Sequence, residues 1–216
     1  MNFHVYPAFA PNWVAEPNDG PGLLEKSQAL RILLADYGLD KPMMITEAGS
    51  HSNADGTTPR TAEDQASYVV ALYTQSLAAN VEAMIWFMLY DPPEWYQNKN
   101  GLMTAEDPPV LKLAYHTYQR TAERLAQLRF ERVLSADELG NERMLGYRFT
   151  NDATGQIVYV VWMAPLYDAQ GATLRLPGAS GQVMDIFGNV NTVNDGGRGT
   201  LQVEVTNRPL IIEVNP

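Results

Sequence analysis

The chain has 216 residues, enough for one large domain or two small ones, and 45% of them are hydrophobic, which suffices for a packed core. A formal net charge of −10 argues against nucleic acid and anionic membrane surfaces as partners, and the lack of cysteine excludes disulfides, thiolate metal sites and a cysteine nucleophile. No apolar run approaches the roughly 20 residues that span a bilayer, and Met1–His4 lacks signal-peptide features, so the sequence predicts a soluble protein without assigning a compartment.

Strands and helices alternate through residues 1–128. Short apolar runs between turn signals are typical of strands, and apolar residues three or four positions apart are typical of helices. The predicted order is a strand over Phe3–Tyr6, a helix over Leu23–Tyr37, a strand over Met43–Glu47, a helix over Thr61–Asn80, a strand in the second half of Val81–Leu89, and a helix over Pro108–Leu128. Such alternation implies a parallel sheet with right-handed crossovers.

Local signals mark the ends of these elements. Gly38 is a suitable helix stop, and the run from Thr61 to Asp64 resembles a capping box in which Asp replaces the usual Glu or Gln. Loops rich in polar residues, Gly and Pro are predicted over Ala8–Gly22, Ser50–Arg60 and Asp91–Asp107.

The period changes near residues 129–135. From there on, short alternating runs are separated by turn clusters, and Asn194–Gly197 is read as a hairpin turn. The predicted strands are Leu145–Phe149, Ile157–Trp162, Thr173–Leu176, Val183–Ile186, Leu201–Val205 and Leu210–Val214. This spacing predicts an antiparallel β-sandwich domain over residues 129–216. Since no long linker precedes it, the two domains are expected to pack together.

Glu47 is the leading candidate for chemistry. It follows the apolar run Met43–Ile45, which is short and bounded by turns, as in a strand buried on both faces. A carboxylate there is rarely a packing residue, because Glu is almost never buried without a partner. The small residues Ala48 and Gly49 leave room for another group to approach. In a parallel barrel, active sites gather at this end of the strands.

Several segments resemble the clan-A retaining glycoside hydrolases, which are (β/α)8-barrel enzymes such as cellulases and β-xylosidases. Thr46–Gly49 is similar to their nucleophile strand, and His4-Val5-Tyr6 stands where the preceding strand often carries a His-x-Tyr pair. Trp86 matches a tryptophan of their last strand, and Asn100–Met103 is similar to the segment that follows. A carboxy-terminal β-sandwich is also common in this clan.

The resemblance implies a role for each of these residues. Glu47 would be the nucleophile, Tyr6 would donate a hydrogen bond to it, and His4 would bind the sugar or orient Tyr6. Trp86 would offer an apolar face and an indole N–H to a sugar ring. Trp95, Tyr96 and Asn98, which lie in the loop Asp91–Asn100, would line the cleft as substrate-binding residues. No metal or cofactor is implied, and the partner would be a carbohydrate with a β-linkage.

The chain departs from the family in one large respect. It supplies only about the last three of eight βα units, so the expected fold is a partial barrel over residues 1–128 followed by the sandwich. The family acid/base lies in an Asn-Glu pair on an earlier strand. Asn141-Glu142 is the only such pair here, and it lies in a predicted turn of the β-rich part, so the role is not transferred to it. Alone, the chain is expected to be inactive.

Structural explanations compete with each assignment. Glu47 would then be a carboxylate paired with Arg or Lys, His4 a satisfied half-buried histidine and Tyr6 a packing residue. Trp86 would be plain core, and Trp95 and Tyr96 would cover the barrel rim. The two remaining histidines, His51 and His116, are expected at the surface, and Asp91, Glu94 and Glu106 are weak candidates for a replacement acid.

Two alternatives to a hydrolase fragment remain open. The first is a non-catalytic carbohydrate-binding or assembly module that covers its exposed sheet by self-association or by pairing with a missing N-terminal barrel part. The second is a compact α/β domain with its own topology, in which Glu47 is incidental. No His, Asp and Glu spacing indicates a metal site, and no Gly-rich loop follows a strand in a phosphate-binding pattern.

Overall fold

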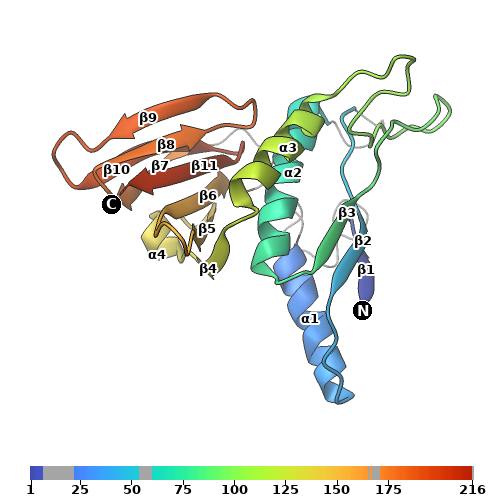
Figure 1. Cartoon of the computed structure of the whole chain (residues 1–216), viewed down its shortest axis with the longest axis horizontal. Helices are drawn as coiled ribbons and strands as arrows, with labels where there is room; N and C mark the ends of the chain where they lie inside the picture. The colour runs from blue at the N-terminus through green and yellow to red at the C-terminus, as the bar shows by residue number, and fades with distance from the viewer. Residues whose placement is uncertain (7–21, 54–59, 165, 167–170, 216) are drawn as a thin grey trace. The chain divides into compact units, whose positions relative to one another are not determined.

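The computed structural model describes residues 1–6, 22–53, 60–164, 166 and 171–215. The chain divides into two compact units, Met1–Tyr118 and Gln119–Pro216 (Figure 1). Nearly all of the predicted loop Ala8–Gly22, and part of the loop Ser50–Arg60, lies outside the described residues.

Unit 1 alternates strands and helices as the periodicity predicts. Its elements are β1 (Asn2–Val5), α1 (Leu23–Asp36), β2 (Met44–Ala48), α2 (Ala62–Ala78) and β3 (Ala83–Trp86), followed by the start of α3 (Leu113–Leu125). The strands form a sheet in the order β1-β2-β3, and both neighbouring pairs are parallel. All three carboxyl ends therefore meet at one edge of the sheet.

Two helix-terminal predictions are confirmed. After α1, Gly38 adopts a left-handed conformation with φ 68°, which glycine tolerates without steric cost. At the start of α2, the Thr61 hydroxyl accepts from the Asp64 N–H at 3.1 Å, and the Asp64 carboxylate accepts from the Thr61 N–H at 2.9 Å. A capping box with Asp at its last position therefore satisfies two helix-end donors.

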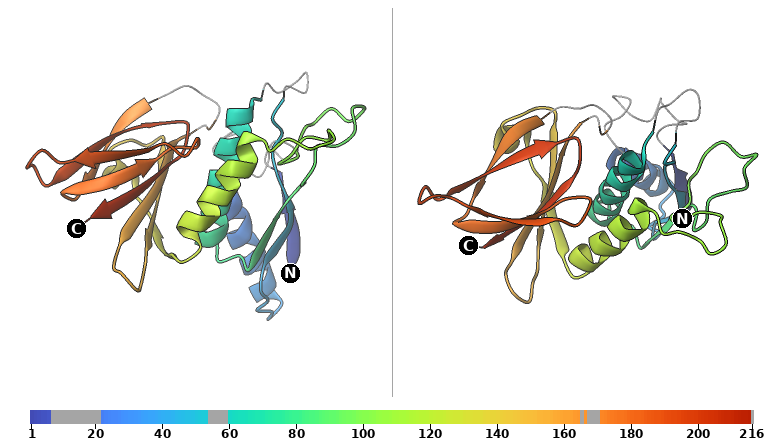
Figure 2. Two further views of the ribbon diagram at one scale, coloured as in Figure 1. Left: turned by 45° about the horizontal axis from the view of Figure 1, so that its top comes forward. Right: turned by 90° about the horizontal axis from the view of Figure 1, so that it is seen from above.

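The helices α1 and α2 lie on the same face of the sheet (Figures 1 and 2). Met43 and Ile45 are fully buried, whereas Ile85 is 51% exposed and both Met44 and Phe87 are also exposed. The expectation that the strands at Glu47 and Trp86 are buried on both faces was wrong, because the described chain supplies helices for one face.

The third helix is shorter than its apolar pattern predicts, Leu113–Leu125 in place of Pro108–Leu128. The residues ahead of it are held in another arrangement: the Val110 N–H donates to the Thr104 hydroxyl at 2.9 Å, and Met103 bridges Leu111. Pro108 and Pro109 add to this, since proline restricts the residue before it to extended conformations.

Unit 2 consists of antiparallel sheets. Its elements are β4 (Arg129–Val133), α4 (Ala136–Leu139), β5 (Met144–Thr150), β6 (Ile157–Met163), β7 (Gly171–Pro177), β8 (Ser180–Met184), β9 (Val190–Asn194), β10 (Thr200–Thr206) and β11 (Leu210–Asn215). One sheet has six strands in the order β4-β5-β6-β11-β8-β9, and β10 pairs with β7 in a second sheet.

The two sheets share one apolar core. Val161 and Ile212 from the six-stranded sheet join Leu174 and Val203 from the β7–β10 pair in a single buried cluster, as in a β-sandwich. The turn Asn194–Gly197 is not a hairpin turn as predicted. It connects β9, which pairs with β8, to β10, which pairs with β7, so the chain changes sheets there.

Candidate functional site

Glu47 lies near the carboxyl end of β2, and two side chains from β1 and its end reach it. The parallel register places His4 directly opposite Glu47, after a shift between Phe3 and His4. The Tyr6 hydroxyl donates to Glu47 Oε1 at 2.5 Å, and His4 Nδ1 lies 3.3 Å from Glu47 Oε2. The structure thus brings together the three residues to which the resemblance assigns the chemistry.

The Glu47 carboxylate is held without being enclosed. Its side chain is 29% exposed, and that of His4 is more exposed still. Each carboxylate oxygen has two lone pairs, so the contacts with Tyr6 and His4 leave acceptor capacity on both oxygens. Glu47 contacts no Arg or Lys side chain among the ion pairs of the described residues, in contrast to the structural alternative of a paired carboxylate.

Tyr6 is kept protonated by its surroundings. Burial raises the pKa of the Tyr6 phenol far above its usual value, and the hydrogen bond to Glu47 and the charge of Glu47 raise this pKa further. The nearby Tyr96 adds a smaller effect in the same direction on the pKa of Tyr6. Tyr6 therefore remains a hydrogen-bond donor to Glu47 at any neutral or mildly alkaline pH.

The room beside Glu47 is occupied by the neighbouring strand. A Cβ on Gly49 would meet the Phe87 carbonyl oxygen at 2.4 Å, and the Phe87 N–H donates to the Ala48 carbonyl at 2.7 Å. Gly49 is therefore needed for the close approach of the chain after β3. The group that approaches these small residues is therefore the main chain of the segment after β3.

Trp86 lies on the side of the sheet that the helices cover. It is buried, it packs edge-on against Tyr68 of α2, and its indole N–H donates to the Asn100 carbonyl at 3.0 Å. The donor that the resemblance offers to a sugar is thus used inside the protein. These contacts fit the core explanation for Trp86.

The loop after β3 carries the other predicted substrate-binding residues. Trp95 is 81% exposed, and its ring contacts that of Tyr96 edge-on, with centroids 6.1 Å apart. Asn98 is partly buried, and its Oδ1 accepts no hydrogen bond from the described residues. This loop follows β3 and so leaves the sheet at the edge where Glu47 lies.

Two residues differ from the sequence expectation. His51 is only 5% exposed, although it was expected at the surface; its position directly after Gly49 and Ser50 was the available signal. Asp91, considered as a replacement acid, forms an ion pair with Lys112 at 2.9 Å and accepts from the Gly101 N–H at 2.8 Å. Asp91 is therefore engaged in holding the chain. His116 is exposed, as expected.

The predicted candidates for a second carboxylate are either engaged in other contacts, as Asp91 is, or exposed. Glu94 and Glu106 are exposed. The Asn141-Glu142 pair lies in a turn of unit 2, as predicted, where Asn141 Oδ1 accepts from the Arg143 N–H at 2.8 Å. Among the described residues, no group of three or more His, Asp and Glu could hold a metal ion, and no helix is long and apolar enough to cross a bilayer.

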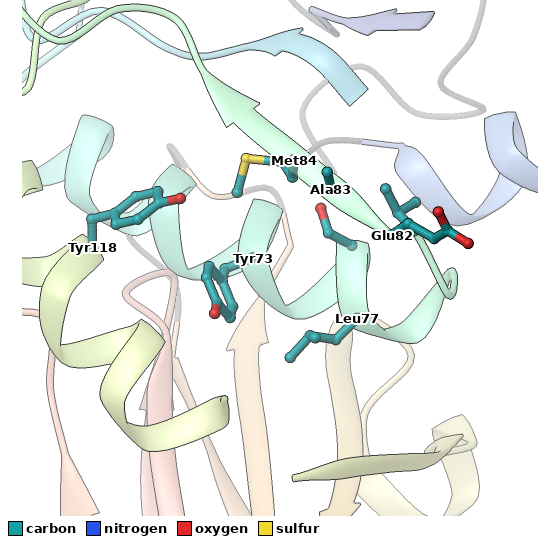
Figure 3. A pocket seen from close by; sticks show the side chains of 8 residues that line it. Tyr73, Leu77, Glu82, Ala83, Met84 and Tyr118 are labelled. Carbon is teal, nitrogen blue, oxygen red and sulfur yellow. The ribbon is translucent and has the colours of Figure 1, made fainter. Parts of the chain in front are cut away.

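A pocket of about 190 Å³ lies elsewhere in unit 1 (Figure 3). It is lined by Tyr73, Ser76 and Leu77 of α2, by the segment 81–84 that enters β3, and by Tyr118. This is the amino end of β3, and in a parallel sheet it is the edge opposite to Glu47. The pocket is therefore separate from the Glu47 site.

Several solved structures with a similar fold are glycoside hydrolases. A family 51 α-L-arabinofuranosidase from Bifidobacterium longum is 12% identical, with a TM-score of 0.54 over 99% of this chain and 52% of that one. A family 86 β-porphyranase from Bacteroides plebeius is 12% identical, with a TM-score of 0.55 over 93% of this chain and 40% of that one. A family 44 xyloglucanase from Paenibacillus polymyxa is 13% identical, with a TM-score of 0.53 over 89% and 36%.

The fold of this chain is similar to part of the fold of each of these three enzymes. It spans 36% to 52% of the length of those three enzymes, and at such identity the likeness concerns the fold alone. No protein-family model matches the chain, and no curated protein does.

Proposed function

We propose that the chain is the carboxy-terminal part of a retaining glycoside hydrolase that acts on a β-linked glycan. In this proposal residues 1–128 are the last three βα units of a (β/α)8 barrel, and residues 129–216 are its β-sandwich domain. Glu47 is the nucleophile. The observation that carries the proposal is the pair of contacts that Tyr6 and His4 make with a carboxylate at the carboxyl end of a parallel strand.

The chemistry follows from these contacts. Glu47 attacks the anomeric carbon and forms a covalent glycosyl-enzyme, while the bond to the leaving oxygen breaks. The Tyr6 O–H and His4 hold the carboxylate in orientation. In the enzyme a second carboxyl group about 5–5.5 Å away protonates the leaving oxygen and then activates water. In this proposal that second group is on an earlier barrel strand, in the remainder of the enzyme.

The remaining predicted residues divide into two groups in this proposal. Trp95, Tyr96 and Asn98 line the glycan cleft from the loop after β3, where Trp95 offers an exposed ring face. Trp86 supports the end of this loop from the core, because it packs on Tyr68 and donates to the Asn100 carbonyl. The fold likeness favours this barrel-derived origin over an unrelated α/β domain.

A leaving group that needs no proton tests the nucleophile in the chain as it is. We expect dinitrophenyl 2-deoxy-2-fluoro-β-glycosides (glucoside, xyloside and galactoside) to esterify Glu47, as detected by mass spectrometry of the peptide. Glu47→Gln replaces the nucleophilic carboxylate with an uncharged amide and serves as the matched control. Fluorogenic β-glycosides with ordinary leaving groups should show no turnover. Turnover that Glu47→Ala abolishes would contradict the need for a missing half, and labelling that persists in Glu47→Gln would contradict the role of Glu47.

The exposed sheet face favours a second candidate, a non-catalytic carbohydrate-binding or assembly module. Ile85, Phe87 and Met44 are exposed, and β1 and β3 each have one edge without a strand neighbour in the described chain. Parallel sheets are almost always covered on both faces. In this alternative a second copy or a separate N-terminal part covers the face, and no covalent labelling of Glu47 occurs.

A further inference from the structure

The loop after β3, Asp91–Gly101, is fixed at many points by residues to which no role has been given. The Lys99 carbonyl is at the centre of these contacts. It accepts from the Ser52 N–H at 3.1 Å, the Ser52 hydroxyl at 3.2 Å and the Lys112 ammonium at 3.1 Å, with the Gln65 amide at 3.4 Å. A carbonyl has two lone pairs, so this oxygen is saturated with donors.

Asn53 joins the loop after β2 to the same segment in both directions. Its amide donates to the Gln97 carbonyl at 2.8 Å, and its Oδ1 accepts from the Lys99 N–H at 2.8 Å. The loops that leave the carboxyl ends of β2 and β3 are thus bonded to each other over a separation of more than forty residues in sequence.

Lys112, directly before α3, and Gln65 of α2 also bond to this loop. The Lys112 ammonium bonds both the Lys99 carbonyl and Asp91, and the side chains of Lys112 and Asp91 are 12% and 11% exposed. Gln65, fully buried in α2, donates to the Ser50 carbonyl at 2.9 Å and to the Gly101 carbonyl at 3.2 Å. Burial lowers the pKa of Lys112, and the hydrogen bond to Asp91 opposes this effect. Such a pair is costly to disrupt, because either partner alone is a buried charge.

We propose that Lys112, Asn53 and Gln65 are positioning residues that hold the Asp91–Gly101 loop in one conformation. Trp95 and Tyr96 then form a preformed rim beside the Tyr6–Glu47 pair, on which successive rings of an extended glycan chain lie. The loop is a fixed wall of the cleft and not a lid that closes on binding. The rim contributes to catalysis only if the proposed function holds. The rigidity of the loop, in contrast, depends only on contacts within this chain.

Amide exchange measured by NMR on the full chain tests the positioning. Lys112→Met should make the amides of Ser52, Lys99 and Gly101 exchange about ten- to hundredfold faster, since hydrogen bonds to charged groups stabilise by about 1.5–3 kcal/mol. The side-chain resonances of Trp95 should shift, because its loop then samples other conformations. Asn53→Ala, at a partly exposed position, is the second variant and should give the same pattern.

Two controls separate positioning from lost stability. Val69→Ala shortens a buried side chain of α2 that makes none of these contacts, so it should lower the melting temperature without shifting the Trp95 resonances. Lys112→Arg keeps the charge and should restore part of the protection. The proposal is overturned if the loop amides and Trp95 respond to Lys112→Met and Asn53→Ala no more than to Val69→Ala.

A labelling comparison connects the rim to the glycan. With fluoroglycoside reagents of one and three sugar rings, Lys112→Met should slow esterification of Glu47 by a larger factor for the longer reagent. An equal loss for both reagents would contradict the role of the rim in chain binding. If the wild-type chain is not esterified at all, the proposed function fails, and the exchange measurement still decides whether these residues position the loop.

Discussion

The bond between Tyr6 and Glu47 decides what the candidate site can do. At 2.5 Å it has the length of a charge-assisted O–H···O⁻ hydrogen bond. Burial raises the pKa of Tyr6, and the same bond raises this pKa further. A neutral tyrosine can only donate a hydrogen bond to the Glu47 carboxylate. Tyr6 therefore orients the carboxylate and does not act as a base at neutral pH.

Replacing Glu47 should release the Tyr6 proton more easily. In Glu47→Gln the negative charge is gone while burial remains, so the pKa of Tyr6 should fall but stay above the ordinary tyrosine value. An NMR titration of tyrosine labelled with 13C at Cζ measures this directly. Tyr73 is a matched control, because burial alone raises its pKa and Glu47→Gln should leave it unchanged. A Tyr6 titration that is identical in both proteins would contradict the coupling.

The same shift has a consequence for stability at alkaline pH. In the unfolded chain Tyr6 has the ordinary tyrosine pKa of 10.0, whereas burial and the bond to Glu47 raise this pKa in the folded chain. The contribution of Tyr6 to the free energy of unfolding is therefore complete below the ordinary pKa and is lost as the pH rises above it. In Glu47→Gln the pKa of Tyr6 is raised less. This variant should therefore lose less free energy of unfolding as the pH rises above the ordinary tyrosine pKa.

The residues of the site differ in how far the sequence could predict them. His4, Tyr6 and Glu47 are named by short motifs, and the parallel register between β1 and β2 brings them together. The contacts of Lys112 and Asn53 could not be predicted, because their partners include main-chain carbonyls remote in sequence. A carbonyl has no side-chain signature, so such a network becomes visible only in the fold.

At the scale of elements, the approach of β2 and β3 at their carboxyl ends places the site. Gly49 lets the Phe87 carbonyl pass where a side chain would stand. The same approach positions the start of the loop that carries Trp95. The geometry of the rim is therefore linked to one residue that has no side chain.

Gly49→Ala should destabilise unit 1 by about 1–3 kcal/mol or more, because its Cβ would overlap a main-chain atom that cannot move alone. The midpoint of urea unfolding measures the loss. Gly171→Ala in β7 is the matched control, since its Cβ would meet ordinary contacts at 3.5 Å and beyond. Equal stability of the two variants would show that the strands can separate at Gly49 without cost.

Two strands that were not predicted share a physical reason. β4 (Arg129–Val133) carries two Arg and one Glu in five residues, and β9 (Val190–Asn194) is mostly polar and exposed. Both are edge strands of the six-stranded sheet, where one side of the strand has no neighbour in it and charged or polar residues are common. Periodicity depends on burial, so it identifies central strands such as β6 (Ile157–Met163) and not these edges.

At the scale of the molecule, unit 1 presents an apolar sheet face. Ile85 and Phe87 project from β3 and the residue after it, and both are exposed. The three enzymes with a similar fold are longer than this chain. The chain covers 52% of the arabinofuranosidase and a smaller share of the other two. A face of this kind favours association when nothing else covers it.

The isolated chain should therefore self-associate as its concentration rises, because association removes apolar area from water. Light scattering over a concentration series measures this. The double variant Ile85→Thr/Phe87→Thr keeps strand propensity and should shift the series toward monomer. Val190→Thr, at an exposed position of β9 in unit 2, should not. A monomer at every concentration would contradict the assembly alternative.

The aromatic pair inside unit 2 has one further use. Trp162 is the only tryptophan of Gln119–Pro216; it is fully buried and stacks on Tyr147 with ring centroids 5.2 Å apart and planes inclined by 15°. Near-ultraviolet circular dichroism depends on such fixed aromatic packing and disappears when the packing loosens. The chain thus contains its own optical probe of the β-sandwich, and Trp162→Phe supplies the blank that separates this signal from that of the sheet around Glu47.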